Sequence, residues 1–405
     1  MTVTAPAPEL TFDALPPDVA EFRDTVRDFA QNVVKPRVLE LDQAPAEDFD
    51  WDIVRKGHAI GLMRMGIPKQ FGGIGLGTLG VAVAIEELAA VDPGVALIFG
   101  GSGLFQTPIL MSGDARLQAR YLPAFTGDDP VLGCNAVTEE LAGLDLIIPG
   151  NAVHTRGIMT ARRDGDHYLL NGKKKFITNG PLAAYASVLA NLEGYEGSTG
   201  LTSFIVDLDQ PGVTRGPVAN KMGYRACLGG ELIFENVKVP VENVVGGELG
   251  GWNLNVAQSN MCRVTCAAVA TGIARAALEK AIDWAGERIQ GGQVLYKHQF
   301  TAGKIAQMAA KVESSRVLYL WAAHKADNQL PAPEYEPAIA KLVADRAAID
   351  VADMATSLIG ARGYVKDYGM EKVLRDSYGP RIYEGTQEAL SILITEGIYR
   401  DRGAN

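Results

Sequence analysis

Cysteine and histidine are scarce in this chain of 405 residues, and they are not spaced for metal binding. The four cysteines, Cys134, Cys227, Cys262 and Cys266, form no CxxC pair, and the five histidines form no HxxxH or HExxH motif. A zinc enzyme is therefore not expected. Cys262 and Cys266 are one helical turn apart in an apolar stretch, where buried thiols are commoner than metal ligands.

Positive charge is also in short supply. The chain has 38 Lys and Arg against 48 Asp and Glu, a net charge of −10, which argues against a nucleic-acid or anionic-membrane partner. We read no apolar run as long enough to cross a bilayer. Residues 1–10 carry Pro6 and Pro8 and resemble neither a signal peptide nor a mitochondrial presequence, since the first arginine is Arg23. We expect a flexible tail there and a cytoplasmic protein.

Residues 11–131 have the apolar periodicity of a helical domain. Between Pro16 and Val33 the apolar positions recur at steps of three and four, which predicts a helix with one buried face. Asp18 is placed to cap this helix, and Pro36 marks its end. Further helices are predicted at 81–91 and 115–122.

Residues 132–246 change to short β-type runs separated by turn residues. The run from His167 to Thr178 contains Asn171-Gly172, a pair that suits a type I′ hairpin turn. Residues 202–208 and 231–239 predict further strands. Because no long helical pattern interrupts these runs, we expect an antiparallel β-domain rather than a parallel α/β sheet.

Residues 247–405 return to helical periodicity, with no proline between Pro240 and Pro331. Long apolar helices are predicted at 255–289, 294–327, 336–359 and 387–399. A four-helix bundle would bury such faces. The predicted fold class is therefore α+β, with an N-terminal helical domain, a middle β-domain and a C-terminal bundle.

One apparent nucleotide-binding motif lacks the flanking sequence that such a site requires. Gly75-Leu-Gly-Thr-Leu-Gly80 matches GxGxxG, but a dinucleotide site requires a hydrophobic strand directly before it. The preceding residues 65–73 contain a proline and several glycines instead. We interpret this segment as a loop that leads into a helix.

The segment Arg381-Ile-Tyr-Glu-Gly-Thr386 resembles the signature of the acyl-CoA dehydrogenase family, whose glutamate is the catalytic base. Residues 360–364 and 371–376 resemble the family's glycine-rich turn and the helix that follows it. The resemblance covers nearly the whole chain. It implies FAD as cofactor and Glu384 as the base. It also implies an architecture of N-terminal helices, a middle β-domain and a C-terminal helical bundle.

Two segments of the middle domain resemble those that hold the flavin ring in this family, Ala136-Val-Thr-Glu139 and residues 171–180. By this resemblance Thr138 and Thr178 hydrogen-bond the flavin, together with the neighbouring Val137 and Ile177. Phe176 stands where the family usually has tryptophan and would pack against the ring.

Residues 288–292 and His298-Gln299 resemble the segment by which one subunit grips the FAD of its neighbour. Arg288 would pair with the pyrophosphate, and Gln299 would reach the nucleotide end. Ser357 and Ala361 replace the usual Gln and Gly of this grip, and Thr386 is a further cofactor position. The resemblance implies a homodimer at least and a homotetramer in the usual family form.

The family's reaction removes two hydrogens from the α and β carbons of an acyl thioester. It needs a base at the α carbon and hydrogen-bond donors at the carbonyl oxygen. Glu384 would supply the carboxylate, with Arg263, Tyr383 and Gly385 beside the substrate. Phe99 and Phe105 are expected in an apolar acyl pocket. An electron-transfer flavoprotein is the usual electron acceptor of relatives.

Some relatives carry the base at the residue before the arginine that matches Arg263. Here that residue is Cys262, a poor substitute, so Glu384 is the candidate that the resemblance supports. Taken singly, each motif also has an ordinary structural explanation, such as a carboxylate at a helix start or a threonine in a strand. Their shared order along one chain favours the family.

Alternative functions remain open at this point. They are oxidation of acyl groups on a carrier protein, a flavin monooxygenase on the same fold, and a non-catalytic thioester- or flavin-binding protein. Leu144 replaces a serine that normally helps to hold the pyrophosphate. The segment 146–163 is longer than usual and carries Arg156, which either substitutes for that contact or belongs to a solvent loop.

Overall fold

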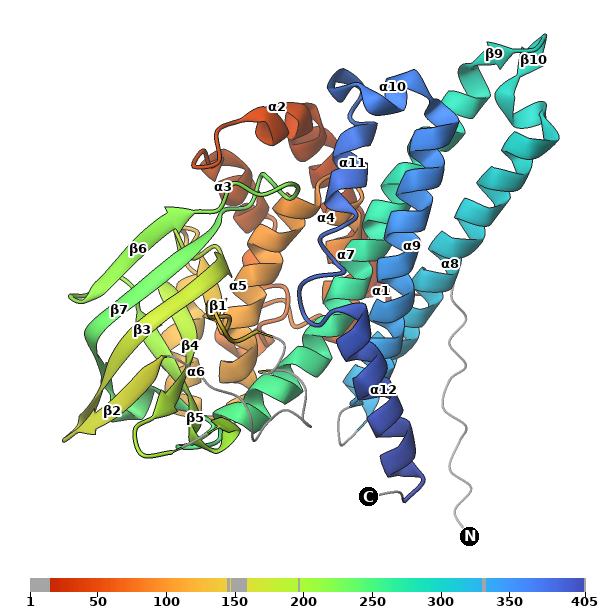
Figure 1. The fold of residues 1–405 in the computed structure, drawn as a ribbon. Coiled ribbons are helices and arrows are strands. Elements are labelled where there is room, and N and C mark those ends of the chain that lie inside the picture. The colour runs from red at the N-terminus through yellow and green to blue at the C-terminus, as the bar shows by residue number, and fades with distance from the viewer. Residues whose placement is uncertain (1–14, 144–145, 147–158, 196, 330–332, 404–405) are drawn as a thin grey trace.

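A computed structural model describes residues 15–143, 146, 159–195, 197–329 and 333–403. Within them, helices come first, a β-sheet second and long helices last, which confirms the predicted architecture. The sheet lies at one side of the molecule and the long helices at the other, with the N-terminal helices between and behind them (Figure 1). The tail at 1–10 lies outside the described residues.

The N-terminal part is helical throughout. Its helices are α1 (Pro17–Phe29), α2 (Val38–Gln43), α3 (Trp51–Ala59), α4 (Gly77–Ala89), α5 (Pro93–Ser112) and α6 (Ala115–Tyr121). In α1 the periodic residues Val19, Phe22, Val26 and Phe29 are buried, as predicted. Asp18 does not cap this helix: Pro16 holds the cap position and Asp18 lies in the first turn.

The glycine-rich segment at 75–80 is a loop that leads into a helix. Gly75 and Gly77 adopt positive φ angles of 72° and 65°, and α4 begins at Gly77. A short 3₁₀ turn at Lys69–Phe71 precedes it, rather than the strand that a dinucleotide site needs.

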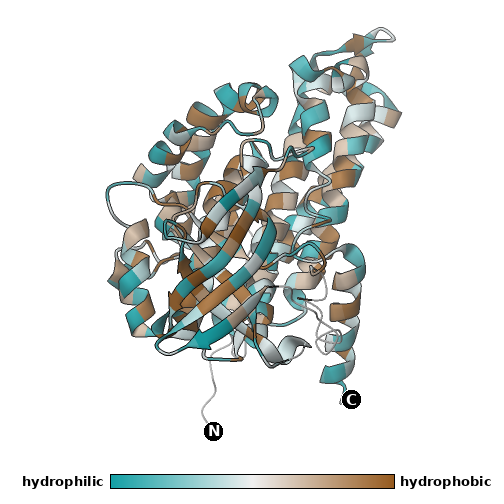
Figure 2. Cartoon of the chain, turned by 60° about the vertical axis from the view of Figure 1, so that its left-hand side comes forward, coloured by the Kyte–Doolittle hydropathy of each residue, from teal (hydrophilic) through white to brown (hydrophobic). Residues whose placement is uncertain are grey.

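The middle part is an eight-stranded sheet with the order β6-β7-β3-β2-β4-β5-β8, and β1 pairs with β4. The strands are β1 (Gly133–Ala136), β2 (Thr160–Asp164), β3 (His167–Thr178), β4 (Tyr185–Leu192), β5 (Leu201–Asp207), β6 (Val213–Val218), β7 (Gly229–Pro240) and β8 (Val244–Val245). Apolar and polar residues alternate along several strands, as expected where one face is buried (Figure 2). The expectation of a purely antiparallel sheet is wrong, because β4 pairs in parallel with both β1 and β2.

The predicted hairpin at Asn171-Gly172 is also wrong. β3 runs straight through this pair, with only a register shift against β7 between Leu170 and Gly172. Because β3 has hydrogen-bonded neighbours along both edges, β2 and β7, the extended conformation satisfies more main-chain groups than a turn would.

The C-terminal part is a bundle of α7 (Gly251–Glu287), α8 (Gln299–Asn328), α9 (Glu336–Ile359) and α12 (Gln387–Asp401). Two short helices, α10 (Ala361–Tyr364) and α11 (Met370–Asp376), link α9 to the segment before α12. A small hairpin of β9 (Ile289–Gln290) and β10 (Gln293–Val294) joins α7 to α8, so α8 starts five residues later than predicted. The four predicted bundle helices are all present.

Helices α5 and α7 each contain a long apolar stretch. Contrary to our reading of the sequence, each is long and apolar enough to cross a membrane by length and composition alone. Here they are core helices, since 61% and 72% of their most apolar windows are buried inside the protein. Both pack on neighbours that matter for function: α5 contacts β1 and α7, and α7 contacts α4 and α9.

Candidate active site

Glu384 lies in the loop between α11 and α12, in a conformation that side chains rarely adopt. Its φ angle is 53°, and Gly385 follows with a φ of 102°. Left-handed backbone at a residue other than glycine is strained and persists where surrounding contacts hold it. Gly385 suits the second position because it has no Cβ. The strain marks this loop as a functional candidate.

Arg263 of α7 is the main contact on the Glu384 backbone. Its side chain is 1% exposed, and its Nε donates a hydrogen bond of 3.2 Å to the carbonyl oxygen of Glu384. Asn260, one turn earlier on α7, orients the guanidinium through Nη1 at 2.5 Å. The structure therefore places Arg263 against the loop of the base, and its contact with substrate stays a prediction.

The environment of Glu384 is suited to a base. Burial raises the pKa of its carboxyl, while the charges of Arg263 and Lys341 and a hydrogen bond from Ser259 act against that rise. A carboxylate with a raised pKa binds a proton more readily near neutral pH. Cys262 and Cys266 lie close by on α7, and burial raises the pKa of both thiols well above normal, so they remain neutral.

An apolar cavity of about 280 Å³ lies between α4, α5 and α7 and reaches Cys262 and Cys266 beside Glu384. Phe99 lines it, as predicted, together with Leu104, Met63, Met65, Met111, Met261 and Val269. Gly103 faces open space, because a Cβ added there meets nothing within 4 Å. The cavity therefore fits an apolar chain, and it reaches two thiols that feel the charge of Glu384.

The prediction that Phe105 lines this cavity is wrong. Phe105 is fully buried in a separate cluster, where its ring stacks on Tyr185 at 5.9 Å and packs beside Tyr121 and Phe125. Phe99 and Phe105 are six residues apart, which places them on different sides of α5. Only Phe99 can reach the cavity.

The two segments predicted to hold the flavin ring lie side by side. Lys175 donates its main-chain N–H to Thr138 O at 2.9 Å, and Lys174 Nζ donates to Val137 O at 2.9 Å. Lys174 also forms a buried ion pair with Glu139 at 2.7 Å, which the sequence did not reveal as a link. Residues about 35 positions apart are thus joined into one surface.

This surface offers the kinds of groups that a flavin ring requires. Phe176 is 70% exposed despite being large and apolar, and its φ angle is 59°. An exposed aromatic ring held in strained backbone fits a stacking role. Thr138 and Thr178 are half-buried, and each has a hydroxyl group that can form hydrogen bonds. Ile177 is buried, so it can offer only its main-chain groups. The residues present fit FAD.

The remaining predicted cofactor residues lie elsewhere. Arg288, Gln299, Ser357 and Ala361 are all exposed, near the end of the bundle that carries the β9–β10 hairpin and α10 (Figure 1). Arg288 caps the C-terminal end of α7 and is 25 residues beyond Arg263, which corresponds to roughly 38 Å along the helix axis. One chain does not bring these residues to its own flavin-ring surface.

Tyr383 and Thr386 flank the base in the loop. The ring of Tyr383 packs 6.1 Å from that of Tyr224, and Lys341 Nζ lies 5.7 Å from its centroid. The hydroxyl of Thr386 accepts from Ala389 N at 3.5 Å and caps α12. Glu388, one turn on, is exposed. The segment 221–225 resembles a family segment in sequence, but the sequence did not reveal that Tyr224 lies beside this loop. Sequence reasoning missed Lys341 altogether, because it belongs to no recognisable local motif.

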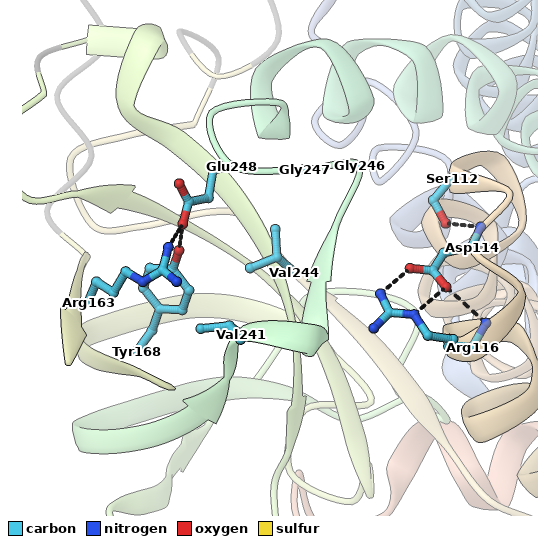
Figure 3. A pocket seen from close by; sticks show the side chains of 10 residues that line it. All are labelled: Ser112, Asp114, Arg116, Arg163, Tyr168, Val241, Val244, Gly246, Gly247 and Glu248. Atoms are coloured by element: carbon cyan, nitrogen blue, oxygen red, sulfur yellow. Dashed lines mark hydrogen bonds and ion pairs between the residues drawn. The ribbon is translucent and has the colours of Figure 1, made fainter. Parts of the chain in front are cut away.

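Two features of the chain stand apart from this site. A surface hollow of about 530 Å³ lies between α6 and the sheet, and Figure 3 shows its charged groups paired with each other, Arg163 with Glu248 and Arg116 with Asp114. None of its lining residues is a predicted site residue. Leu144 and Arg156 lie outside the described residues, so the proposed role of the 146–163 insert stays a hypothesis.

Comparison with known proteins gives consistent matches along the chain. The models for the N-terminal, middle and C-terminal domains of acyl-CoA dehydrogenase match residues 16–128, 134–237 and 250–399. Cyclohex-1-ene-1-carbonyl-CoA dehydrogenase of Geobacter metallireducens is 36% identical over 366 residues, covering 90% of this chain and 93% of that protein.

Two solved structures match with a TM-score of 0.89 each. Butyryl-CoA dehydrogenase from Megasphaera elsdenii is 31% identical, and a chain in the structure of the electron transferring flavoprotein of Acidaminococcus fermentans is 32% identical. In both cases the match covers 96% of this chain and 99% of the other. With the loop of Glu384, the apolar cavity and the flavin-ring surface in place, the chain belongs to the acyl-CoA dehydrogenase family of flavoproteins, oxidoreductases that act on CH–CH bonds.

Proposed function

We propose that this protein catalyses the FAD-dependent α,β-dehydrogenation of an acyl-CoA thioester, with Glu384 as the base that removes the α proton. The observation that carries the proposal is the position of Glu384. Its strained loop holds a carboxyl of raised pKa beside an apolar cavity of about 280 Å³. A base next to an acyl-sized cavity is what removal of an α proton requires.

Different side chains have different roles in the proposed reaction. Bound FAD supplies the acceptor for the β hydride. Glu384 takes the α proton, and its own main-chain N–H is the donor proposed for the thioester oxygen. Arg263 keeps the Glu384 peptide in place, and the apolar cavity wall excludes water from the acyl chain. Thr138, Thr178 and Phe176 would hold the flavin ring, with Val137 and Ile177 contributing main-chain groups.

We infer a homo-oligomer, because the predicted flavin-ring residues belong to the sheet, whereas the other predicted cofactor residues lie at the hairpin end of the bundle. A second copy can bring Arg288, Gln299, Ser357 and Ala361 to the cofactor of the first. The same end of the bundle exposes large apolar side chains, which is typical of a protein interface. They are Ile289, Tyr296, Phe300, Tyr364, Val365 and Tyr368, with Phe300 92% exposed. A homotetramer is proposed from the family resemblance.

Three finer statements remain proposals. We propose an electron-transferring flavoprotein as the acceptor of electrons from the reduced protein, a role in fatty acid metabolism, and a cytoplasmic location. The alternative substrates, acyl groups on a carrier protein, and the alternative reaction, flavin monooxygenation, are less well supported. The loop of Glu384 has a use in dehydrogenation and none in monooxygenation.

The test is an anaerobic titration of the purified yellow protein with a panel of acyl-CoA thioesters, followed by absorbance. The panel contains straight, branched and cyclic acyl groups, and the matched carrier-protein thioesters serve as comparison. Bleaching of the flavin by a CoA thioester, with the enoyl product identified by mass spectrometry, is the expected result. Bleaching by carrier-protein thioesters alone would overturn the CoA assignment, and no bleaching at all would overturn the dehydrogenation.

A further inference from the structure

Lys341 is a second buried cation that contacts the loop of the proposed base, which Arg263 contacts from α7. It lies on α9 and is 0% exposed. Its Nζ donates three hydrogen bonds, to Asp345 Oδ2 at 2.7 Å, Pro380 O at 2.6 Å and Gly385 O at 3.1 Å. An ammonium has three donors, so this set uses all of them.

The two carbonyl groups that Lys341 contacts lie on either side of Glu384 in the sequence. Pro380 precedes Glu384 by four residues, and Gly385 follows it directly. Arg263 holds the carbonyl of Glu384 itself, so consecutive carbonyls of the loop are held by α7 and α9. The left-handed φ angles of Glu384 and Gly385 need such support, because relaxed backbone would leave that region. We propose that Lys341, oriented by Asp345, is a positioning residue that sets both the geometry and the charge environment of Glu384.

The charge of Lys341 reaches the Glu384 carboxyl as well as its backbone. Lys341 and Arg263 both lower the pKa of Glu384 against the raising effect of burial. The other titratable groups facing this region are Cys262 and Cys266 of α7, together with Tyr224 and Tyr383. Burial raises the pKa of these four groups and keeps them uncharged. Arg263 and Lys341 are therefore the cations that act on the base.

Asp345 determines how strongly the charge of Lys341 acts on the Glu384 carboxyl. It lies one turn beyond Lys341, is 0% exposed, and also feels the charge of Arg381 in the loop. Burial raises the pKa of Asp345, and the Lys341 ammonium opposes this. While it is ionised, Asp345 offsets the charge of Lys341. Changes at the two residues should therefore affect Glu384 in opposite directions.

The test rests on the proposed function and measures the rate of flavin reduction by a reactive acyl-CoA across pH in stopped flow. The acid limb of this pH profile is the range in which the rate falls because Glu384 becomes protonated. Lys341→Met removes a charge that lowers the pKa of Glu384, so the acid limb should move up by roughly one pH unit. Burial raises the pKa of Asp345 to about 7, so wild-type Asp345 opposes Lys341 above that pH. Asp345→Asn leaves Lys341 unopposed there, so its acid limb should move down. Both variants should reduce the maximal rate more than they change the half-saturating substrate concentration, because the loop and not the acyl cavity is disturbed.

Two further variants separate positioning from folding. Lys341→Arg keeps the charge and should keep the acid limb of the wild type. Lys372→Met is the matched control, since Lys372 is a buried lysine of α11 that pairs with Asp376 one turn away and also with Asp92. It should lower stability and leave the acid limb in place. If Lys341→Met fails to fold, the Asp345→Asn profile decides.

Acid limbs that do not move, or that move in the same direction in Lys341→Met and Asp345→Asn, would overturn the positioning role. So would an acid limb that moves equally in Lys372→Met. A wild-type protein that is not bleached by any thioester would instead contradict the proposed function. The two failures are thus distinguishable.

Discussion

The Nε of Arg263 lies 3.2 Å from the carbonyl oxygen of Glu384, a residue 121 positions later in the chain. Arg263 is almost fully buried on α7, so this contact fixes the loop of the proposed base to the longest helix of the fold. Because α7 also forms one wall of the apolar cavity, the proposed base and the cavity share a rigid support. This arrangement is what positions a carboxylate at a particular carbon of a bound chain.

Arg263→Gln should lower the rate of flavin reduction. The Glu384 carbonyl would lose a charged donor, and bonds of that kind contribute about 1.5 to 3 kcal/mol, or roughly 10- to 100-fold in rate. Stopped-flow reduction by an excess of acyl-CoA measures the effect. A wild-type rate would show that the loop holds its geometry without this contact.

Glu384→Gln should abolish bleaching by acyl-CoA while the protein keeps its fold and its flavin. A positioned base accounts for about 10²- to 10⁴-fold of a rate, so the remaining reduction should be at least that much slower. Glu388→Gln is the matched control, because Glu388 is exposed one turn further on. Normal bleaching by Glu384→Gln would assign the base elsewhere.

Gly103→Leu should shorten the acyl chains that the protein accepts. A Cβ at this position meets no neighbour within 4 Å, so a leucine side chain would extend into the cavity that Gly103 lines. We expect activity with the largest accepted acyl groups to fall by tenfold or more, while short ones react normally. Gly286→Leu is the control, since Gly286 also has open space but lies outside the cavity. Unchanged chain-length preference in Gly103→Leu would place the acyl chain elsewhere.

Glu87 on α4 should contribute stability that depends on pH. Burial raises its pKa, but hydrogen bonds from Arg275 and Arg27 outweigh burial and lower it to about 2, from 4.5 when unfolded. A lowered carboxyl pKa stabilises the folded state above pH 4.5 and loses this effect as the pH falls towards 2. Glu87→Gln should cost about 3 kcal/mol near neutral pH, since Arg275 and Arg27 lose the charge of the Glu87 carboxylate.

Urea unfolding of wild type and Glu87→Gln between pH 7 and 3 measures this contribution. The difference in unfolding free energy between the two should shrink as the pH falls through 4. A difference that stays constant over this range would contradict the assigned pKa. The test requires no substrate and is independent of the proposed reaction.

Arg288→Ala should weaken FAD retention although Arg288 lies far from the flavin-ring surface of its own chain. The reason is that a second copy would use it to hold the pyrophosphate. Flavin absorbance after gel filtration, with the oligomer size measured in the same run, gives the result. Arg55→Ala, at an exposed arginine of α3, is the control and should retain FAD fully. Equal retention by both variants would argue against a cofactor held between subunits.

Local patterns in the sequence predicted most of the secondary structure. The helix at 336–359 matches α9 at both ends, and the buried face of α1 follows the apolar spacing. These elements depend on residues three or four positions apart, which a sequence displays directly. Where pairing along two strand edges competed with a local turn signal, at Asn171-Gly172, the tertiary contact prevailed and the prediction failed.

The sequence by itself therefore determined the order of helices, sheet and bundle, the family, and the identity of Glu384 as the candidate base. Only the tertiary structure decided which side chains surround that base. It placed Phe99 at the cavity and Phe105 away from it, and it brought Arg263, Lys341 and Asp345 to one loop from two helices. Burial and electrostatic contacts between residues some 40 to 120 positions apart leave no periodic trace in the chain, because they depend on how the helices pack rather than on their own spacing.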